Sequence, residues 1–345
     1  MRVLVVNAGS SSLKLSLLDA EDSELWSSEL AAPRALVDPE AVGATLRELP
    51  DVPYVAGHRI VHGGGRFREA VVIDEQVEAA LRDLVALAPL HQAKSLAALD
   101  AVARALPNVP AVACFDTAFH ATLPPEAATY ALPRAWRERY GVHRYGFHGL
   151  SHAYAARAAG KARRVVTCHL GAGASLCAVL EGRSVDTTMG FTPLEGLVMA
   201  TRCGSVDPGL LLWLLQHEDL GVDEMADALE HESGLLGLAG TADMRELAAR
   251  DDPDSDLAIG VYVHRLRAGI GAMAAALGGL DALVFTGGVG ENAVRIRELA
   301  CEGLSHLGVG APESRVRVLV VHAREDLEIA RQARALLGVQ GLEHL

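Results

Sequence analysis

One pattern constrains this chain more than any other, and it occurs twice: a strand, a short turn of small residues, and a second strand. Residues 2–18 read RVLVVNAGSSSLKLSLL, and residues 164–180 read RVVTCHLGAGASLCAVL. Aliphatic and β-branched runs of this length predict strands, and the glycines and serines between them predict tight turns. The repetition predicts an α/β chain with two domains of similar build, each with a turn suited to gripping phosphate.

Length and charge narrow the class of protein. The chain has 345 residues, which favours two domains because single cores stop growing near about 250–300 residues. It carries 44 acidic and 31 basic residues, and this balance argues against nucleic acid as a partner. No apolar run approaches the roughly 20 residues that span a bilayer, and the apolar run at the N-terminus is too short for a signal peptide. We expect a cytoplasmic protein without a membrane or nucleic-acid partner.

The five cysteines agree with that compartment. They are widely spaced, with no pair in a C-x-x-C arrangement. Such spacing predicts neither a disulfide framework nor a zinc site.

The remaining segments alternate between strand and helix patterns. Residues 20–52 are polar, acidic and helix-leaning. Further strands are predicted within 52–67, which runs into a glycine-rich loop, and at 109–116, 280–286 and 315–321. Helices are predicted at 74–88, 93–106, within 145–159, near 207–231 and 242–278, and at 325–337.

The first turn presents a candidate phosphate grip. If residues 10–14 are extended, Ser10, Ser12 and Lys14 point to one face, while the leucines between and after them point into a core. The other interpretation is a solvated hairpin face. Only three of the 31 basic residues are lysines, so Lys14 stands out, whereas we attribute Lys94 and Lys161 to chance.

Several common motifs are absent or incomplete. No G-x-x-x-x-G-K-[ST] occurs, which excludes a P-loop ATPase, and the glycines after His169 do not fit G-x-G-x-x-G. GGVGEN at 287–292 fits either a close backbone approach to a ligand or a plain strand–helix turn. His148 and His152 are four apart but lack the H-E-x-x-H pattern, so structural or substrate-contacting roles are favoured over zinc.

Ten motifs in one order give a specific resemblance. They are NAGSSSLK, GHRIVHGG, PLH, FDTAFH, RYGFHGLSH, CHLGAGAS, DTTMGFTPLEGL, TRCGSVDP, FTGGVGEN and EDLEIAR, and they run from residue 1 to about 331. Together they resemble the acetate kinase family. That family belongs to the sugar kinase–heat-shock–actin superfamily, which implies two ribonuclease-H-like (actin-like ATPase) domains around a nucleotide cleft. We expect residues 1–118 plus 326–345 to form the first domain and 119–325 the second.

The resemblance implies a role for each matching position. The catalytic group comprises Asp116, Arg59, Arg202 and His148. The nucleotide and phosphate group comprises Ser10, Ser12, Lys14, His169, Gly171, Gly173, Asp243, Arg245, Gly288, Val289 and Asn292. The apolar acyl pocket comprises Val61, Leu90, His91, Phe147 and Pro193, and the metal site Asn7 and Glu325.

The implied reaction is reversible phosphoryl transfer between ATP and acetate, giving ADP and acetyl phosphate. It uses Mg²⁺, with Mn²⁺ as an alternative. Two anions must meet, so fixed positive charge and alignment matter more than covalent help. Two arginines, a histidine donor and the metal supply that charge. Asp116 need not be a strong base, because acetate is already ionised, and we expect it to orient an arginine.

Three positions depart from the family pattern. Ala172 stands where an asparagine is usual, Gln92-Ala93 where Asn-Pro follows PLH, and Cys203-Gly204-Ser205 where S-G-D is usual. One lost neutral hydrogen bond to phosphate costs about 0.5–1.5 kcal/mol, so we expect an active enzyme that is at most roughly tenfold slower. Gly288 keeps the adenosine loop small, which favours ATP over pyrophosphate.

Rival functions stay open at this point. A propionate or butyrate kinase differs by one or two methylenes in the pocket, worth only about 1–3 kcal/mol each. A nucleotide-binding sensor that has lost turnover is favoured only by Ala172, and an actin-like filament is a weaker option. The resemblance implies a homodimer formed through the second domain. The chain is shorter than is usual in the family, and the shortening is expected within 20–52.

Overall fold

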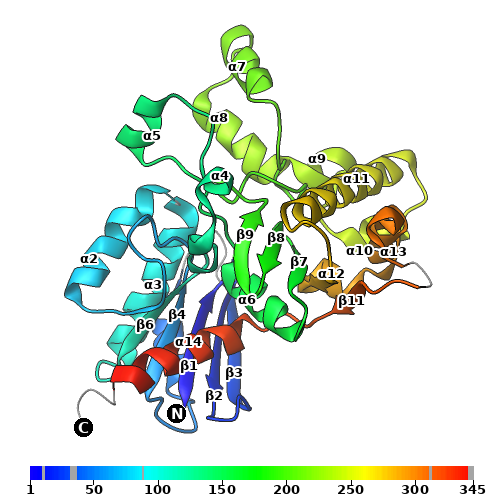
Figure 1. Cartoon of the computed structure of the whole chain (residues 1–345). Helices are drawn as coiled ribbons and strands as arrows, with labels where there is room; N and C mark the ends of the chain where they lie inside the picture. The colour runs from blue at the N-terminus through cyan, green and yellow to red at the C-terminus, as the bar shows by residue number, and fades with distance from the viewer. Residues whose placement is uncertain (10–11, 32–36, 88, 311–312, 341–345) are drawn as a thin grey trace. The chain divides into compact units, whose positions relative to one another are not determined.

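We describe the protein from a computed structural model of the whole chain (Figure 1). The structure describes residues 1–9, 12–31, 37–87, 89–310 and 313–340. Within these ranges the side chains of 86, 87, 89–91, 339 and 340 are not described. The chain divides into two compact units. Unit 1 is Met1–Ala121 together with the C-terminal segment from Arg324, and unit 2 is Thr122–Ala323.

Unit 1 is built on a six-stranded mixed sheet. Its order is β3-β2-β1-β4-β6-β5, with bounds Glu24–Ala31, Ser12–Leu18, Val3–Ala8, Val55–Ile60, Ala111–Phe115 and Val71–Val72. The hairpin β1–β2 is antiparallel, and β4 and β6 continue parallel to β1. Leu13, Leu15 and Leu17 are at most 1% exposed whereas Lys14 is exposed, so the predicted alternation is confirmed.

Helices cover both faces of this sheet. They are α1 (Pro39–Leu46), α2 (Glu75–Asp83), the 3-10 turn η2 (Leu84–Leu87), α3 (Pro89–Ala105) and α14 (Glu325–Gln340). Ala56 of β4 packs in one cluster with Ala98 of α3. A Cβ on Gly57, the next residue, would lie 2.6 Å from Ile329 of α14. Successive strand residues face opposite sides, so α3 and α14 cover opposite faces.

The helix-leaning interpretation of 20–52 is wrong for residues 24–31. They form β3, the edge strand that pairs antiparallel with β2, with Trp26 opposite Leu17 and Leu30 opposite Leu13. Both Trp26 and Leu30 pack against the core of unit 1. Tertiary pairing with β2 therefore overrides the local preference of a polar segment. A helix is present later in the segment, as α1.

Unit 2 repeats the same sheet plan. Its order is β11-β10-β7-β8-β9, with bounds Arg317–Val320, Ala282–Thr286, Arg164–Leu170, Ala174–Leu180 and Arg183–Thr187. The strands β7, β8 and β9 form an antiparallel meander, and β10 and β11 are parallel to β7. In unit 1 the strands β1, β2, β3, β4 and β6 are connected and paired in the same way. The prediction of two α/β halves of similar build is confirmed.

Helices and turns complete unit 2, and α11 is the longest. The others are α4 (Pro125–Ala128), α5 (Arg134–Tyr140), α6 (Gly149–Ala158), α7 (Pro208–His217), α8 (Val222–Asp227), the π turn η4 (Ala228–Glu232), α9 (Gly234–Ala239), α10 (Met244–Ala249), α12 (Gly287–Asn292), α13 (Val294–Glu302) and the 3-10 turn η5 (Ser305–Leu307). A further 3-10 turn, η3 (Ala118–Thr122), lies at the boundary between the units. Helix α11 spans Pro253–Ala276, where Asp252 caps it by accepting from Ser255 N at 3.0 Å. Among the described residues, no helix is long and apolar enough to cross a membrane.

Candidate active site

The carboxyl ends of parallel strands β4 and β6 bring Arg59 and Asp116 together. Arg59 Nη2 lies 2.6 Å from Asp116 Oδ2, and Arg59 Nε donates to both carboxylate oxygens at 3.1 and 3.2 Å. The two side chains are 14% and 1% exposed. This is a buried, multiply hydrogen-bonded ion pair, the strong kind. The sequence-based expectation that Asp116 orients an arginine is consistent with these contacts.

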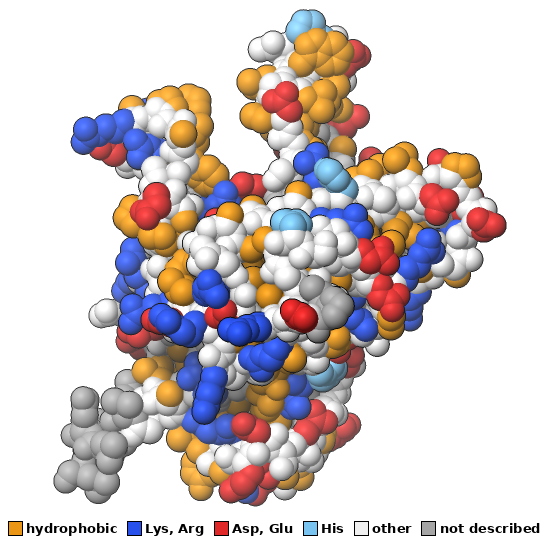
Figure 2. Space-filling view, turned by 45° about the vertical axis from the view of Figure 1, so that its right-hand side comes forward, with side chains coloured by type: hydrophobic (Ala, Val, Ile, Leu, Met, Phe, Trp, Pro, Cys, Tyr) orange, Lys and Arg blue, Asp and Glu red, His pale blue; other side chains and the backbone are white. Residues whose placement is uncertain are grey.

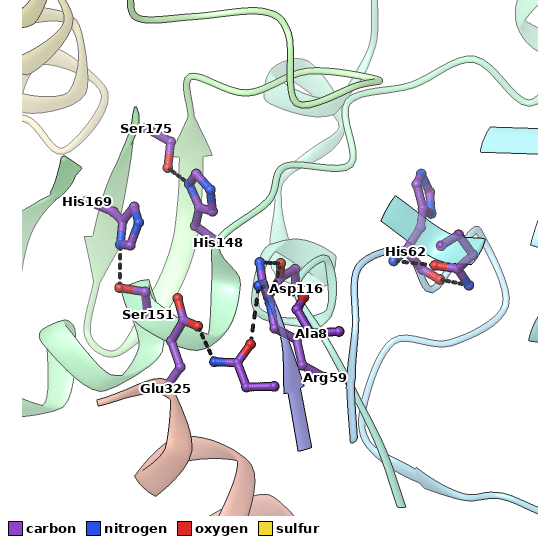
Figure 3. A network of polar contacts seen from close by, with 11 residues as sticks. Ala8, Arg59, His62, Asp116, His148, Ser151, His169, Ser175 and Glu325 are labelled. Carbon is purple, nitrogen blue, oxygen red and sulfur yellow. Dashed lines mark hydrogen bonds and ion pairs between the residues drawn. The ribbon is translucent and has the colours of Figure 1, made fainter. Parts of the chain in front are cut away.

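Asn7 and Glu325 extend the pair into a network of unit 1 (Figure 3). Arg59 Nη1 donates to Asn7 Oδ1 and to the Ala8 carbonyl, both at 3.3 Å, and Asn7 Nδ2 donates to Glu325 Oε2 at 3.0 Å. Burial acts to lower the pKa of Arg59, but Asp116 and Glu325 outweigh it and raise that pKa. The guanidinium therefore stays charged and is held in one orientation.

Gln92 holds the glycine-rich loop after β4 in place. In the sequence, this residue was noted only because it departs from the family pattern. Gln92 is fully buried; its Oε1 accepts from His62 N at 3.1 Å and its Nε2 donates to His62 O at 3.3 Å (Figure 3). Val61, of the expected acyl pocket, is 7% exposed beside this loop. Leu90 and His91 lie in α3, and their side chains are outside those described.

The three lysines behave differently. Lys14 and Lys161 are exposed, but Lys94 of α3 is only 2% exposed. Burial, reinforced by the positive charge of Arg59, lowers the pKa of Lys94. Lys94 is thus a buried lysine whose pKa is affected by Arg59. No sequence signal separated it from an exposed lysine.

The first turn is only partly described. Ser12 opens β2 and is half-buried, and Lys14 lies opposite Asn7 in the hairpin register. Ser10, the other member of the predicted grip, lies outside the described residues.

A second group of polar side chains lies in unit 2 around the turn between β7 and β8. A Cβ on Gly173 would lie 3.1 Å from Arg202 Nη2 and 3.2 Å from His148 Nε2. Both side chains therefore flank the same point of the backbone, where only glycine fits without displacing them. Gly171 closes the turn by donating from its N–H to the Gly173 carbonyl at 2.9 Å.

Arg202 is bound differently from Arg59. Its Nη1 donates to the Pro193 carbonyl at 2.7 Å. Burial lowers the pKa of Arg202, and only the charge of Glu230 acts in the other direction. A cation whose burial is not matched by a close carboxylate is well suited to receive an anion.

The loop that contains Pro193 is held in place by Arg144 and Tyr130, neither of which was singled out in the sequence. Arg144 Nη1 donates to three carbonyls, those of residues 187, 188 and 189, and its Nη2 lies 2.8 Å from Glu195 Oε1. The Tyr130 hydroxyl donates to Glu195 Oε2 at 2.6 Å and accepts from Phe191 N at 2.9 Å. Phe147, of the expected pocket, is 1% exposed.

Histidines and hydroxyls form a connected group behind His148. His148 Nδ1 lies 3.0 Å from Ser175 Oγ, and His169 Nδ1 lies 2.8 Å from Ser151 Oγ (Figure 3). The His148 and His169 ring centroids are 4.4 Å apart. His152 is fully buried and is bonded to hydroxyls, as a structural histidine would be.

The expected nucleoside contacts lie on two separate elements. Asp243 caps α10 and pairs with Arg245 at 2.7 Å, so this pair is mutually satisfied. Gly288, Val289 and Asn292 lie in α12, where Asn292 Nδ2 donates to the Gly288 carbonyl at 2.9 Å. The glycines were expected to form a turn between strand and helix, but they lie within α12, which begins at Gly287, and Gly288 faces open space.

Ala172 and the segment Cys203-Gly204-Ser205, the other two departures from the family pattern, make contacts that stabilise the backbone. The Ala172 carbonyl accepts from Ala200 N at 3.1 Å, which ties the β7–β8 turn to the segment before Arg202. Ser205 Oγ accepts from Gly196 N at 3.1 Å, and Cys203 Sγ donates to the Gly204 carbonyl at 3.1 Å. These contacts stabilise the backbone near Arg202.

The side chains that could hold a metal ion are few. The described residues contain no group of three or more His, Cys, Asp or Glu side chains that could hold a metal ion. The Glu325 carboxylate nevertheless lies beside the Asn7 amide, whose nitrogen donates to Glu325 Oε2 and whose oxygen accepts from Arg59 Nη1. Mg²⁺ commonly takes one or two such protein ligands and completes its shell with substrate phosphates and water. The Glu325 carboxylate fits that arrangement, and the Asn7 oxygen fits it once it turns from Arg59.

Fold and site together define a class: two-unit α/β proteins with actin-like domains, as in the sugar kinase–heat-shock–actin superfamily. The profile of the acetokinase family matches residues 40–324. The chain belongs to this family. It is 44% identical to the acetate kinase of Clavibacter sepedonicus, over 97% of this chain and 99% of that protein.

Solved structures agree with this assignment. Porphyromonas gingivalis acetate kinase has 34% identity and a TM-score of 0.88, covering 97% of this chain and 99% of that one. A propionate kinase from Francisella tularensis has 33% identity and a TM-score of 0.87, covering 96% and 98%. The alignment to the Clavibacter sepedonicus protein runs over 394 positions, more than the 345 residues here, so this chain is the shorter of the two.

Proposed function

We propose that this protein is an acetate kinase that transfers a phosphoryl group reversibly between ATP and acetate, giving ADP and acetyl phosphate. The observation that carries the proposal is the pair of Arg202 Nη2 and His148 Nε2, both within 3.2 Å of the Cβ position on Gly173. Two nitrogen groups that converge on one glycine turn form a site for an anion. Membership of the acetokinase family gives that anion its identity as phosphate.

Each group of residues has a proposed task. Arg59 and Arg202 hold the acyl phosphate and the transferring phosphoryl group, and His148 bonds to the latter. Asp116 keeps the Arg59 guanidinium in position through its bonds of 2.6 to 3.2 Å. Membership of the acetokinase family implies direct in-line transfer, for which these residues would supply alignment and charge stabilisation.

The remaining predicted residues bind the nucleotide and the acid. Ser10, Ser12, Lys14, His169, Gly171 and Gly173 serve the phosphates; Asp243, Arg245, Gly288, Val289 and Asn292 serve the nucleoside; Val61, Leu90, His91, Phe147 and Pro193 surround the acyl group. Support comes from the open space at Gly288 and from the burial of Val61 and Phe147.

Magnesium is the proposed metal, with Mn²⁺ as an alternative. Asn7 and Glu325 would hold it together with the nucleotide phosphates. When bound, it would neutralise charge on those phosphates. The chain's own contribution is to place the Glu325 carboxylate beside the Asn7 side chain, 3.0 Å from its amide nitrogen, so that an amide rotation would bring the Asn7 oxygen to the metal as well.

The test of this function is trapping of acetyl phosphate as its hydroxamate. We expect product with acetate, ATP and Mg²⁺, and a rate at least about 100-fold lower in Asp116→Asn, because the amide no longer fixes Arg59 by an ion pair. Asp100→Asn is the matched control, since Asp100 is a 41% exposed carboxylate of the same unit that pairs with Arg82. Absence of product at high acetate would refute the kinase proposal and favour a nucleotide-binding sensor.

A propionate or butyrate kinase is the second candidate. The observation in its favour is the TM-score of 0.87 to the Francisella tularensis propionate kinase, against 0.88 to an acetate kinase. One methylene changes selectivity by only about 1–3 kcal/mol. Competition among acetate, propionate and butyrate for the enzyme, reported as kcat/KM ratios, separates the two candidates.

We propose a cytoplasmic homodimer that associates through unit 2. Helix α7 supports this, because Leu210, Leu212 and Trp213 are 49%, 58% and 49% exposed on it. Hydrophobic side chains gather on this helix at the top of Figure 2. Exposed apolar patches of this kind commonly mark interfaces. Light scattering after gel filtration should give twice the 36.4 kDa chain mass, and Trp213→Glu should give the monomer mass.

A further inference from the structure

Gln92 of α3 holds both main-chain groups of His62 (Figure 3). The His62 N–H can only donate, so the side-chain atom that lies 3.1 Å from it is the amide oxygen Oε1 of Gln92. This orientation turns Nε2 towards two carbonyls, that of His62 at 3.3 Å and that of Leu81 at 3.4 Å. Gln92 is fully buried, and its amide oxygen and its amide nitrogen both have partners. The side chain is therefore fixed in one orientation.

The Gln92 amide joins the loop after β4 to a packed core. Leu81 lies in the last turn of α2, where backbone carbonyls lack the usual helical partner, so Gln92 Nε2 donates to an acceptor that needs one. Leu81 and Leu96 of α3 lie in one buried cluster with Ile60 of β4. The bonds to His62 are thus made from a rigid part of unit 1.

These bonds matter because of Val61, which is proposed to lie beside the acyl group. The peptide unit before Val61 is held through the Ile60 carbonyl, which accepts from Asp116 N at 3.0 Å. The peptide unit after Val61 is held through His62 N, which donates to Gln92 Oε1. Because peptide units are planar, holding both of them fixes the backbone of Val61. Of these two bonds, only the one to Gln92 involves a side chain and can be removed by substitution.

We propose that Gln92 is a specificity-determining positioning residue: it holds Val61 in place in the wall of the acyl site and so limits the size of the carboxylic acid that the enzyme accepts. Gln92 acts through the main chain of His62 and Val61. The inference rests on the proposed kinase function and adds the contact that sets its choice among short-chain acids.

The residues on either side of this segment are held by other groups. Gly63 N donates to Thr117 Oγ1 at 3.0 Å. Arg59 is held by its ion pair of 2.6 Å with a buried carboxylate. Loss of the Gln92 bonds should therefore release Val61 while Arg59 stays in position. This arrangement predicts a change in acid selectivity rather than a general loss of activity.

The test shortens the side chain by one methylene group. In Gln92→Asn, the amide cannot keep its contacts of 3.1 to 3.4 Å from the same position of α3, so Val61 can move away from the acid. We expect kcat/KM for acetate to fall more than kcat/KM for propionate. The acetate-to-propionate ratio should fall roughly fivefold, since one methylene changes selectivity by about 10- to 200-fold at most. KM for ATP should stay within about twofold of the wild-type value.

The matched control is Gln332→Asn. Gln332 is a half-buried glutamine of α14 in the same unit, and its amide donates to Glu328 of the same helix at 2.7 Å. This variant should keep the wild-type acid ratio. A ratio in Gln92→Asn that equals the wild-type ratio or moves towards acetate overturns the proposal. A KM for ATP that rises as much as KM for acetate overturns it as well.

A double-mutant cycle tests whether Gln92 acts through Val61. Val61→Ala removes the proposed wall itself, so adding Gln92→Asn to Val61→Ala should change the acid ratio by less than about twofold. If Gln92→Asn has its full effect on the ratio in that background, Gln92 does not act through Val61 and the proposal is wrong.

The last measurement does not depend on activity. Hydrogen exchange of the substrate-free protein, followed by mass spectrometry, reports local opening of the backbone. Peptides that cover 60–64 should exchange faster in Gln92→Asn than in wild type and Gln332→Asn, while peptides from β10 of unit 2 should not change. Equal exchange at 60–64 refutes the proposal whatever the activity. If exchange differs but wild type forms no acyl phosphate from acetate, propionate or butyrate, the kinase function itself is refuted, and Gln92 is left with a role in loop structure alone.

Discussion

Arg59 and Arg202 are assigned to the same reaction, yet the two units treat them in opposite ways. In unit 1, Arg59 is bound to a carboxylate at 2.6 Å, and its pKa is raised. In unit 2, Arg202 is bound to a carbonyl at 2.7 Å, and burial lowers its pKa. Arg59 is thus paired with a carboxylate inside its unit. The guanidinium of Arg202 is bonded to a neutral carbonyl, so its positive charge is available to an anion.

The largest effect should come from breaking the unit 1 pair. Arg59→Ala leaves Asp116 buried and unpaired, so we expect loss of activity together with a loss of about 3–5 kcal/mol in unfolding free energy. Urea unfolding measures the second effect. Arg59→Ala with Asp116→Asn should recover most of the stability but none of the activity. An Arg59→Ala protein of wild-type stability would contradict this assignment.

The corresponding change in unit 2 should separate activity from stability. Arg202→Ala removes the guanidinium charge that is proposed to hold the phosphoryl group, and we expect kcat/KM for acetyl phosphate to fall about 10³-fold. Because its partner is a carbonyl, unfolding free energy should change by no more than about 1 kcal/mol. Near-normal turnover in Arg202→Ala would remove the proposed clamp, and marked destabilisation would erase the contrast with Arg59.

The acid stability of unit 1 offers a third test. His58 of β4 is 1% exposed, neither ring nitrogen has a partner among the described residues, and burial lowers its pKa to about 3. The unfolded chain binds this proton near pH 6.5 and the folded one does not, so the group destabilises the fold as pH falls. His58→Leu should reduce the stability lost between pH 7.5 and 5 by about 2 kcal/mol, measured by urea unfolding.

The control for that test is His306→Leu, which alters an exposed histidine. It should leave the pH dependence as in wild type. An unchanged slope in His58→Leu would show that His58 is not the source.

The smallest expected effect concerns the turn at Gly173, which Arg202 and His148 flank. In Gly173→Ala, the new Cβ would meet Arg202 Nη2 at 3.1 Å and His148 Cε1 at 3.1 Å. Both side chains must move by a few tenths of an ångström, and we expect kcat to fall about tenfold with the melting temperature nearly unchanged. Gly182→Ala, at a turn with open space but positive φ, shows what a strained glycine costs without the site.

The sequence predicted what local pattern determines. Alternation of leucines located the core face of β2, and small residues located both hairpin turns. It missed β3, whose residues alternate only between exposed and half-buried, because an edge strand of polar residues lacks an apolar period. Its pairing partner, not its composition, decides its structure.

The residues of the candidate site divide in the same way, into those that local motifs indicate and those that only tertiary contacts reveal. Arg59, Asp116, Arg202 and His148 could be proposed from the sequence because each lies in a motif with a familiar order. Lys94 and Gln92 could not, because their importance comes from burial and from neighbours far along the chain. The bonds between Gln92 and His62 span 30 residues, and no spacing rule marks them.

The helix α14 has a consequence for how the protein is made. It covers one face of the unit 1 sheet, where Ile329 packs on Gly57, and it begins with Glu325. Residues of unit 2 are contiguous from Thr122 to Ala323, so all of them are synthesised before α14. The first unit to be translated is therefore the last to be finished. A chain without α14 would lack both the cover of one sheet face and one of the two side chains proposed for the metal.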